Sequence, residues 1–345
     1  MKALTSHGAG DIRFEDYADP TCNADTDLIV KMKTCGICGS DLHIYHGARF
    51  TGDTGFCVGH EAIGEVAEVG RGVHKFKAGD QVMLSAAVGC GSCASCMSGH
   101  INRCENNQMG CYGLGHNLEG CQAEGIRVPM GDFNVRHIPE GITEDQALML
   151  TDNLPTAYLG CLNADIAPGK TVAVVGLGPI GLMAVELALV MGAAQVYALD
   201  LVPERRARAE ALGATALDPV TAKAQITELT KGRMLDCAVE AVGSDVTIRA
   251  AIDLVGAQGT VSVIGVNQSM DFKFPMGLAF IKGLTFRISA CSVQCHWDEL
   301  VALIQSGRLH PESVITHRMG LSEGSEAYRL FDTKEDGALK MVMSI

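Results

Sequence analysis

The sequence predicts an α/β protein with two domains, a β-rich domain and a domain built on a doubly wound parallel sheet. Three observations lead to this prediction. The chain has 345 residues, which is more than one ordinary hydrophobic core accommodates. Residues 1–150 are rich in glycine and in short apolar runs. After about residue 155, strand-like and helix-like segments alternate, as in parallel sheets that carry helices on both faces.

The expected elements follow in order. In the first 150 residues, the short apolar runs Leu28–Lys33, Ala62–Val69 and Gln81–Ser85 are typical of strands. The character of the sequence changes near Asp152–Ala157. Strands are then expected at Thr171–Val175, Gln195–Asp200, Leu235–Glu240 and Thr260–Val266, and helices at Ile180–Met191, Glu204–Leu212 (stopped by Gly213) and Val246–Leu254. The tail from about residue 291 is expected to form one helix, Trp297–Ser306, and otherwise mixed short elements.

The composition argues against several classes of function. The formal net charge of −13 disfavours binding to nucleic acid or to an anionic membrane surface, because both need clustered Lys and Arg. No run of about 18 uncharged apolar residues occurs, so no membrane span is expected. Met1–Thr26 is polar and acidic and lacks the pattern of a secretory signal, so the cytoplasm is the expected location.

Four cysteines carry the most specific pattern in the chain. Cys90, Cys93, Cys96 and Cys104 follow the spacing C-x2-C-x2-C-x7-C, with Gly and Ser in the gaps. Four thiolates at this spacing hold zinc in a closed tetrahedral cage that leaves no position for a substrate. The 14 cysteines of this long chain therefore indicate metal binding rather than a disulfide scaffold. A structural zinc ion is predicted.

A glycine-rich turn predicts a dinucleotide site. Gly176-Leu-Gly178-Pro179-Ile180-Gly181 follows an apolar strand and opens a helix, which is the context of the Rossmann fingerprint. The helix N-terminus would then face the pyrophosphate. Asp200 ends the next strand, where a carboxylate accepts hydrogen bonds from the ribose hydroxyls and repels a 2′-phosphate, so NAD is favoured over NADP. Asp200 could instead cap the helix near Pro203, and Arg205 could partner a phosphate.

A second, open metal site is expected around Cys38 and His60. A thiolate, an imidazole and a carboxylate form a mixed ligand set that zinc accepts. Cys35 and Cys38 form C-x-x-C, which by itself fits a redox pair or half of a second cage. The dense cysteine cluster downstream is already complete, which argues against a second cage. His60-Glu61 offers a ring nitrogen and a carboxylate at adjacent positions, although a single histidine is more often a hydrogen-bonded core residue.

Taken together, these motifs resemble those of zinc-dependent medium-chain alcohol dehydrogenases. The resemblance spans nearly the whole chain and rests on five ordered motifs: Gly36-Ile-Cys38-Gly-Ser-Asp-Leu-His43, Gly59-His60-Glu61-Ala-Ile-Gly64, the four-cysteine segment, Val174-Val-Gly176-Leu-Gly178-Pro-Ile-Gly181 and Val263-Ile-Gly-Val266. It implies a GroES-like, β-rich catalytic domain formed by 1–153 and 291–345, and a Rossmann domain formed by 154–290. It also implies two zinc ions per chain, NAD, a small alcohol or carbonyl substrate, and a homodimer or homotetramer.

The resemblance assigns the open metal site residue by residue. It makes Cys38 the ligand, rather than Cys35, and His60 the second ligand. It places the third ligand in Leu150-Thr-Asp152-Asn-Leu-Pro-Thr156, where Asp152 has the required chemistry. Asp152 could also be a helix N-cap. Glu61 resembles the family's carboxylate that enters or leaves the metal shell.

Further positions match those that handle the proton and the cofactor. Ser40 and His43 correspond to the family's proton relay, although they could also be a turn residue and a solvent-facing loop histidine. Thr156 corresponds to a position against the nicotinamide, with a helix-start cap as the alternative. Val266 ends a motif that corresponds to a cofactor-binding segment. The implied reaction is hydride transfer between an alcohol held at zinc and NAD.

The chain departs from the family pattern at two positions. Gly39 stands where several members have a cationic residue on the pyrophosphate, and Lys340 is a candidate to supply that charge. Ala86 stands where some primary-alcohol enzymes have a bulky aromatic residue, which favours secondary alcohols or polyols. Two other functions are compatible with the motifs. One is a zinc- and NAD-dependent formaldehyde or aldehyde dehydrogenase, which Asp152 permits. The other is a non-catalytic, zinc-stabilised NAD-binding protein.

Overall fold

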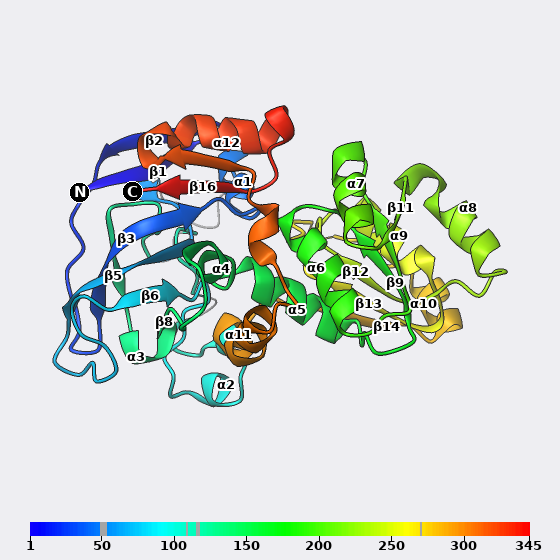
Figure 1. Cartoon of the computed structure of the whole chain (residues 1–345), viewed down its shortest axis with the longest axis horizontal. Helices are drawn as coiled ribbons and strands as arrows, with labels where there is room; N and C mark the ends of the chain where they lie inside the picture. Colours follow the sequence, from blue (N-terminus) through cyan, green and yellow to red (C-terminus); the bar gives the residue numbers. More distant parts are fainter. Residues whose placement is uncertain (49–53, 108–109, 115–117, 270) are drawn as a thin grey trace. The chain divides into compact units, whose positions relative to one another are not determined.

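The chain forms two compact units (Figure 1). The computed structural model describes residues 1–48, 54–107, 110–114, 118–269 and 271–345. The first unit consists of Met1–Pro155 and Cys291–Ile345, and the second of Thr156–Ala290. The bounds implied by the family resemblance differ slightly at the first division, which they place after residue 153, and coincide at the second.

The second unit is built on a six-stranded, all-parallel sheet in the order β11-β10-β9-β12-β13-β14. Its strands are β9 (Thr171–Val175), β10 (Gln195–Leu199), β11 (Thr215–Leu217), β12 (Leu235–Glu240), β13 (Val255–Val263) and β14 (Thr285–Ile288). Its helices are α6 (Pro179–Val190), α7 (Pro203–Ala211), α8 (Pro219–Leu229), α9 (Asp245–Leu254) and α10 (Met276–Lys282), and α5 (Asn153–Asn163) leads into it. The strand order reverses between β9 and β12, and ligands bind such sheets beyond the carboxyl ends of the strands at that point.

The predicted strands of this unit are present because their residues are buried on both faces of the sheet. Val172–Val175 in β9 and Val196–Leu199 in β10 are all buried, which explains their unbroken apolar runs. One predicted strand was wrong in its bounds. The strand expected at Thr260–Val266 begins at Val255 and ends at Val263. It ends there because the N–H groups of Ile264 and Gly265 both donate to the Glu240 carbonyl.

The first unit is mostly antiparallel. Its larger sheet has the order β15-β16-β3-β5-β6-β8, with β7 also paired to β3, and a small sheet has the order β2-β1-β4. The strands are β1 (Lys2–Gly8), β2 (Asp11–Asp16), β3 (Leu28–Gly36), β4 (Phe56–Cys57), β5 (Glu61–Val69), β6 (Gln81–Leu84), β7 (Gly125–Val128), β8 (Val135–His137), β15 (His317–Gly320) and β16 (Met341–Ser344). In β3, Leu28, Val30 and Met32 point into the core of this unit, and Lys31 and Lys33 between and after them are exposed.

Short helices close this unit. They are α1 (Asp41–Tyr45), α2 (Ala94–Met97), α3 (Gly131–Asn134), α4 (Glu144–Met149), α11 (Trp297–Gln305) and α12 (Gly324–Thr333), with single-turn 3-10 helices at Ile101–Arg103, Val293–His296, Pro311–Val314, Leu321–Glu323 and Glu335–Gly337. The helix predicted at Trp297–Ser306 is present as α11. The ten-residue α12 was not predicted; it buries Ala327, Tyr328 and Phe331 on one face. No helix in the described ranges has the length and hydrophobicity needed to cross a membrane.

Candidate metal centre and cofactor site

Four potential ligand atoms of three chemical kinds meet in the first unit. One atom each from Cys38, His60, Glu61 and Asp152 lies within 4.8 Å of the others. The sheet explains much of this meeting. Cys38 follows the end of β3, His60 precedes the start of β5, and Gly36 pairs with Glu61 across these antiparallel strands. Asp152 approaches from the turn before α5.

The spacing of the donor atoms suits a tetrahedral zinc ion. Zinc ligands at their usual bond lengths lie about 3.3–3.8 Å from one another in a tetrahedron. The Cys38 Sγ lies 3.4 Å from Asp152 Oδ2, and His60 Nε2 lies 3.6 Å from the same oxygen. The three side chains predicted to bind the catalytic metal therefore converge. Their sulfur, nitrogen and oxygen atoms form a set that fits zinc.

His60 is oriented from behind by Asp41, a residue that sequence reasoning missed. His60 Nδ1 lies 3.2 Å from Asp41 Oδ1, so Nε2 faces Cys38 and Asp152. Asp41 is fully buried, and its Oδ2 accepts a hydrogen bond of 2.8 Å from the Cys38 N–H. A carboxylate behind a metal-binding histidine is a recurrent second partner in zinc sites. Burial lowers the pKa of His60, but Asp41 and other nearby groups outweigh this effect and hold that pKa well above its usual range.

The cluster concentrates negative charge in a buried space. Burial raises the pKa of the Cys38 thiol to about 11, with the Asp152 and Glu61 carboxylates adding to the effect. A bound cation would reverse this preference, because a metal ion binds the thiolate and neutralises nearby carboxylates.

Ser40 and His43 lie beside this cluster. The Ser40 Oγ is 3.2 Å from His60 Nε2, so its hydroxyl is at the face where the ligand atoms converge. His43 lies on α1, its N–H donating to the Ser40 carbonyl at 3.2 Å. Partial burial lowers the pKa of His43, which favours the neutral imidazole. The position of the two residues is compatible with the predicted relay.

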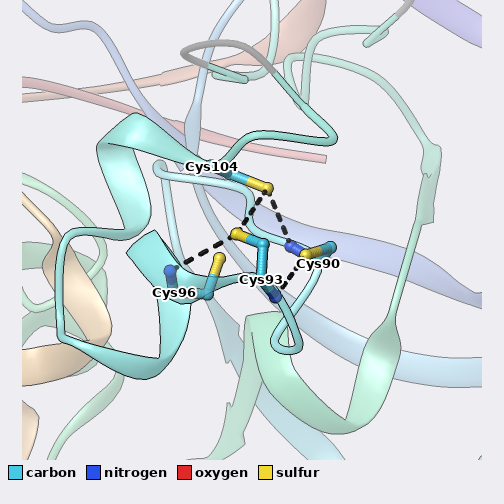
Figure 2. Close-up of side chains that lie close together, drawn as sticks. All are labelled: Cys90, Cys93, Cys96 and Cys104. Atoms are coloured by element: carbon cyan, nitrogen blue, oxygen red, sulfur yellow. Dashed lines mark hydrogen bonds between the residues drawn. The ribbon is translucent and has the colours of Figure 1, made fainter.

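The four-cysteine cluster is also formed (Figure 2). The sulfur atoms of Cys90, Cys93, Cys96 and Cys104 lie within 4.8 Å of one another, and those of Cys93 and Cys104 are 4.0 Å apart. Backbone N–H groups point at the sulfurs. The Cys93 N–H donates to Cys90, and the Cys96 N–H donates to Cys93. The Ser92 hydroxyl is the largest influence that lowers the pKa of Cys90, to about 5, so this thiol readily becomes a thiolate.

The glycine turn of the second unit has the geometry expected of a dinucleotide site. Gly176 has φ +92°, and a side chain there would meet Val242 at 2.3 Å. A Cβ on Gly181 would lie 1.8 Å from the Gly176 carbonyl oxygen, so only glycine lets α6 pack this closely. A Cβ on Gly178 would meet no other atom within 4 Å, which leaves open space before the start of α6. Pro179 and Ile180 form the first turn of α6.

Asp200 and Arg205 lie where the sequence predicted them. Asp200 follows β10, and its two carboxylate oxygens accept the N–H groups of Leu177 at 2.7 Å and Val202 at 2.8 Å. Arg205 Nη1 is 4.0 Å from the Asp200 carboxylate. Val266 lies in the loop after β13 and is 47% exposed. Thr156 lies in the first turn of α5 and does not precede that helix.

Comparisons with known proteins identify the family of the chain. The family model described as the alcohol dehydrogenase GroES-like domain matches residues 24–140, and the model described as zinc-binding dehydrogenase matches residues 179–306. A protein from Mycobacterium tuberculosis named probable zinc-binding alcohol dehydrogenase is 40% identical over 328 residues, covering 95% of this chain and 84% of the relative. The chain belongs to the zinc-dependent medium-chain alcohol dehydrogenase family.

Solved structures of similar proteins extend the comparison. The alcohol dehydrogenase TADH from Thermus sp. ATN1 has a TM-score of 0.93 and 37% identity, covering 100% of this chain and 99% of its own. A zinc-binding dehydrogenase from Sinorhizobium meliloti bound to NADP (27% identity, TM-score 0.85) and a dehydrogenase from Escherichia coli complexed with NADH (25% identity, TM-score 0.88) each cover 99% of their own chains. This dehydrogenase is therefore an enzyme that catalyses the oxidation and reduction of alcohols and uses zinc and a nicotinamide cofactor.

Asn153 is the residue of the dehydrogenase that sequence reasoning overlooked most clearly. Its amide Nδ2 lies 2.6 Å from Glu61 Oε1, 3.3 Å from Asp152 Oδ2 and 3.7 Å from Cys38 Sγ. One amide group thus touches three of the four side chains in the cluster. Its place directly after Asp152 was the one available signal.

Lys340 of the dehydrogenase is buried beside the metal-ligand cluster, where it pairs with Glu61. Its side chain is 0% exposed, its ammonium donates to the Ile37 carbonyl at 3.0 Å, and it forms an ion pair with Glu61. The hypothesis that Lys340 supplies the charge missing at Gly39 is therefore wrong, because the buried ammonium is already paired. The Glu61 carboxylate is held by Lys340 on one oxygen and Asn153 on the other.

Proposed function

We propose that this dehydrogenase oxidises secondary or polyol-like alcohols with NAD and carries two zinc ions per chain. Cys38, His60 and Asp152 would hold the catalytic ion, and Cys90, Cys93, Cys96 and Cys104 the structural one. The convergence of four ligand atoms within 4.8 Å, in the unit that also carries Ser40 and His43, is the observation that supports the catalytic role most directly.

The residues around the first cluster have separable tasks in this proposal. Bound zinc would supply a Lewis acid that increases the acidity of an alcohol, and the nicotinamide would accept the hydride. Asp41 holds His60 in position, and Asn153 and Lys340 fix Glu61 beside the three ligands. Ser40 would accept the alcohol proton and pass it toward His43. Thr156 and Val266 would contact the cofactor.

Metal analysis and a substrate panel test the proposal together. We expect about two zinc ions per chain, with one removed by a chelator in parallel with activity. The panel follows NADH absorbance with matched primary and secondary alcohols, polyols and formaldehyde. A zinc content near one, or activity that survives complete loss of the removable ion, would contradict the proposed catalytic site. A clear preference for small primary alcohols or formaldehyde would contradict the proposed substrate class.

Ala86 supports the preference for branched substrates. Its side chain is buried, and its N–H donates to the carbonyl of Thr151, the residue directly before the proposed ligand Asp152. A small side chain at this point leaves more room near the metal than an aromatic ring would.

The cofactor preference gives a test at position 200. We expect Asp200→Ser to raise the ratio of kcat/KM with NADP to that with NAD by about 10- to 100-fold. The substitution removes a charged hydrogen-bond acceptor for the ribose and the repulsion of a 2′-phosphate. Steady-state kinetics with both cofactors provide the measurement. Asp218→Asn serves as a control, because Asp218 caps α8 instead of following β10, and the ratio should not change.

The role of Asn153 gives a second test. We expect Asn153→Ala to weaken the removable zinc by about 10- to 100-fold, as substitutions behind metal ligands usually do. Zinc competition with a chromophoric chelator measures this affinity without relying on turnover. Asn163→Ala, at the other end of α5, is the matched control. Unchanged zinc affinity in the Asn153 variant would remove its proposed role.

We also propose that the dehydrogenase self-associates through the edge of the second unit. β14 is the last strand of the parallel sheet, and its Ile288 is 57% exposed. On the neighbouring α10, Phe280 is 85% and Ile281 81% exposed. An exposed apolar group beside an open strand edge suits a homodimer or homotetramer. Ile281→Glu should lower the mass measured by light scattering, whereas Val246→Glu, at another exposed apolar position, should not.

A cytoplasmic location is part of the proposal. All 14 cysteines are free thiols, and nine of them are buried. Both clusters proposed to bind zinc depend on reduced cysteine sulfur, which the cytoplasm maintains.

A further inference from the structure

A cleft in the first unit lies outside both metal clusters and the dinucleotide turn. It has a volume of 560 Å³, within the range of small-molecule sites. Its walls come from the loop before β6, from α3 and β8, and from the start of α11. Figure 1 draws α11 close to α3 and β8. None of the residues proposed above as zinc ligands or cofactor contacts lines it.

The walls of the cleft are aromatic. Phe76, Phe133 and Trp297 line it, and Phe76 and Trp297 are largely buried, so the rings are fixed by packing. The Phe76 ring stacks on the imidazole of His137 with centroids 4.6 Å apart. Trp297 Nε1 donates to the Leu150 carbonyl at 2.9 Å, which holds the indole. Such surfaces favour the binding of a flat aromatic ring, because contacts between aromatic rings contribute free energy beyond that of the apolar area they bury.

The rim of the cleft carries two cationic side chains in a chain with a net charge of −13. Lys75 and Arg136 line it together with the imidazole of His137, and Asp132 is its acidic member. The Asp132 carboxylate already accepts the N–H groups of His74 and Lys75 at 2.9 Å each. Among the described residues, the Lys75 ammonium has a backbone carbonyl as its hydrogen-bond acceptor and no carboxylate within 4.0 Å.

The other polar groups of the rim have acidic partners. The His137 imidazole lies 3.0 Å from the Asp80 carboxylate. Arg136 pairs with Asp298 at 2.6 Å, and the Asp298 side chain is 89% exposed. An exposed pair of this kind contributes little, and a ligand anion can replace the surface carboxylate. An incoming carboxylate would therefore meet one uncompensated ammonium and one guanidinium that gives a planar, two-pronged contact.

We propose that this cleft binds an aryl carboxylate, with the ring against Phe76 and Trp297 and the carboxylate between Lys75 and Arg136. The site is distinct from the metal centre. One hydrogen bond connects the cleft with the segment that carries the proposed metal ligand Asp152. The Trp297 N–H donates to the carbonyl of Leu150, which lies two residues before Asp152.

The single tryptophan of the chain makes the site directly observable. With 5-fluorotryptophan incorporated, the protein has one ¹⁹F resonance, that of residue 297. Titration with 2-naphthoate should shift this resonance saturably, and the uncharged 2-naphthamide should bind at least about fivefold more weakly, because it lacks the ion pairs. Lys75→Ala should weaken naphthoate binding about three- to fivefold. The matched control Lys77→Ala removes an exposed lysine of the same loop that does not line the cleft, and should leave binding unchanged.

A carboxylate could also bind a metal ion, so the titration is repeated with Cys38→Ser, which removes a proposed zinc ligand. Naphthoate binding that persists there, and that still depends on Lys75, supports the cleft. Loss of binding in the Cys38 variant with full binding in the Lys75 variant would assign naphthoate to the metal centre and overturn the proposal. The absence of a saturable shift, or equal affinity for the amide, would also overturn it.

Discussion

The Cys38→Ala substitution is expected to lower kcat/KM for alcohol oxidation by at least about 10⁴-fold, since a zinc ion supplies several kcal/mol of charge stabilisation in such reactions. The variant would keep only His60 and Asp152 of the three proposed ligands. We expect its removable zinc to be lost while the protein stays folded, because the contacts of the Cys38 sulfur are with residues of the ligand cluster. Zinc content, circular dichroism and NADH binding measured on the same sample separate these effects.

Cys35→Ala is the matched control for this experiment. Cys35 lies three positions earlier, is 0% exposed, and packs in the hydrophobic core of the first unit. Its sulfur is not part of the metal-ligand cluster found among the described residues. We expect this variant to be destabilised by about 1 kcal/mol but to keep both zinc ions and its turnover. If Cys35→Ala loses the removable zinc and Cys38→Ala retains it, the assignment of the ligand is reversed.

The second large effect is expected for Cys96→Ala. Cys96 is buried in the four-cysteine cluster, where it packs with Ile101 and Cys104. Loss of a ligand should release the structural zinc, whose binding stabilises the folded segment directly. We expect the free energy of unfolding to fall by about 4 kcal/mol or more, and the melting temperature by about 10 °C or more. Calorimetry and zinc analysis provide the measurements.

Two outcomes distinguish a zinc effect from a general effect of removing a thiol. Cys22→Ala removes a cysteine outside both clusters and should change the melting temperature by no more than a few degrees. Added zinc should restore stability to partly demetallated wild-type protein but not to the Cys96 variant. A Cys96→Ala protein with two zinc ions and an unchanged melting temperature would contradict the structural role.

The sequence predicted the central elements of the second unit well because their signals are local. The strand Thr171–Val175 has the predicted bounds, and α6 begins one residue before the predicted Ile180. A buried parallel strand and a glycine turn leave a continuous pattern in the chain. α8 and α10 were not predicted. Lys282 closes α10 by donating to the carbonyls of Ile252 and Val255, contacts that depend on distant residues.

The environment of the metal centre could be predicted only in part. Cys38 and His60 lie in recognisable motifs, but their mutual position depends on the antiparallel pairing of β3 with β5. Asp41 resembles any helix-start acid in sequence, and its contact with His60 exists only in the folded chain. The ion pair between Lys340 and Glu61 joins residues 279 positions apart, so no local pattern could reveal it.

By itself, the sequence determined the donor types, the spacing of the four cysteines and the glycine turn, because each follows from chemistry carried by a few neighbouring residues. Tertiary structure alone decided that Lys340 neutralises Glu61, that Asn153 touches three side chains of the metal cluster, and that three aromatic side chains, a lysine and an arginine line one cleft. Those outcomes depend on which distant groups share a desolvated space, where an unpaired charge or amide is costly and must find its partner.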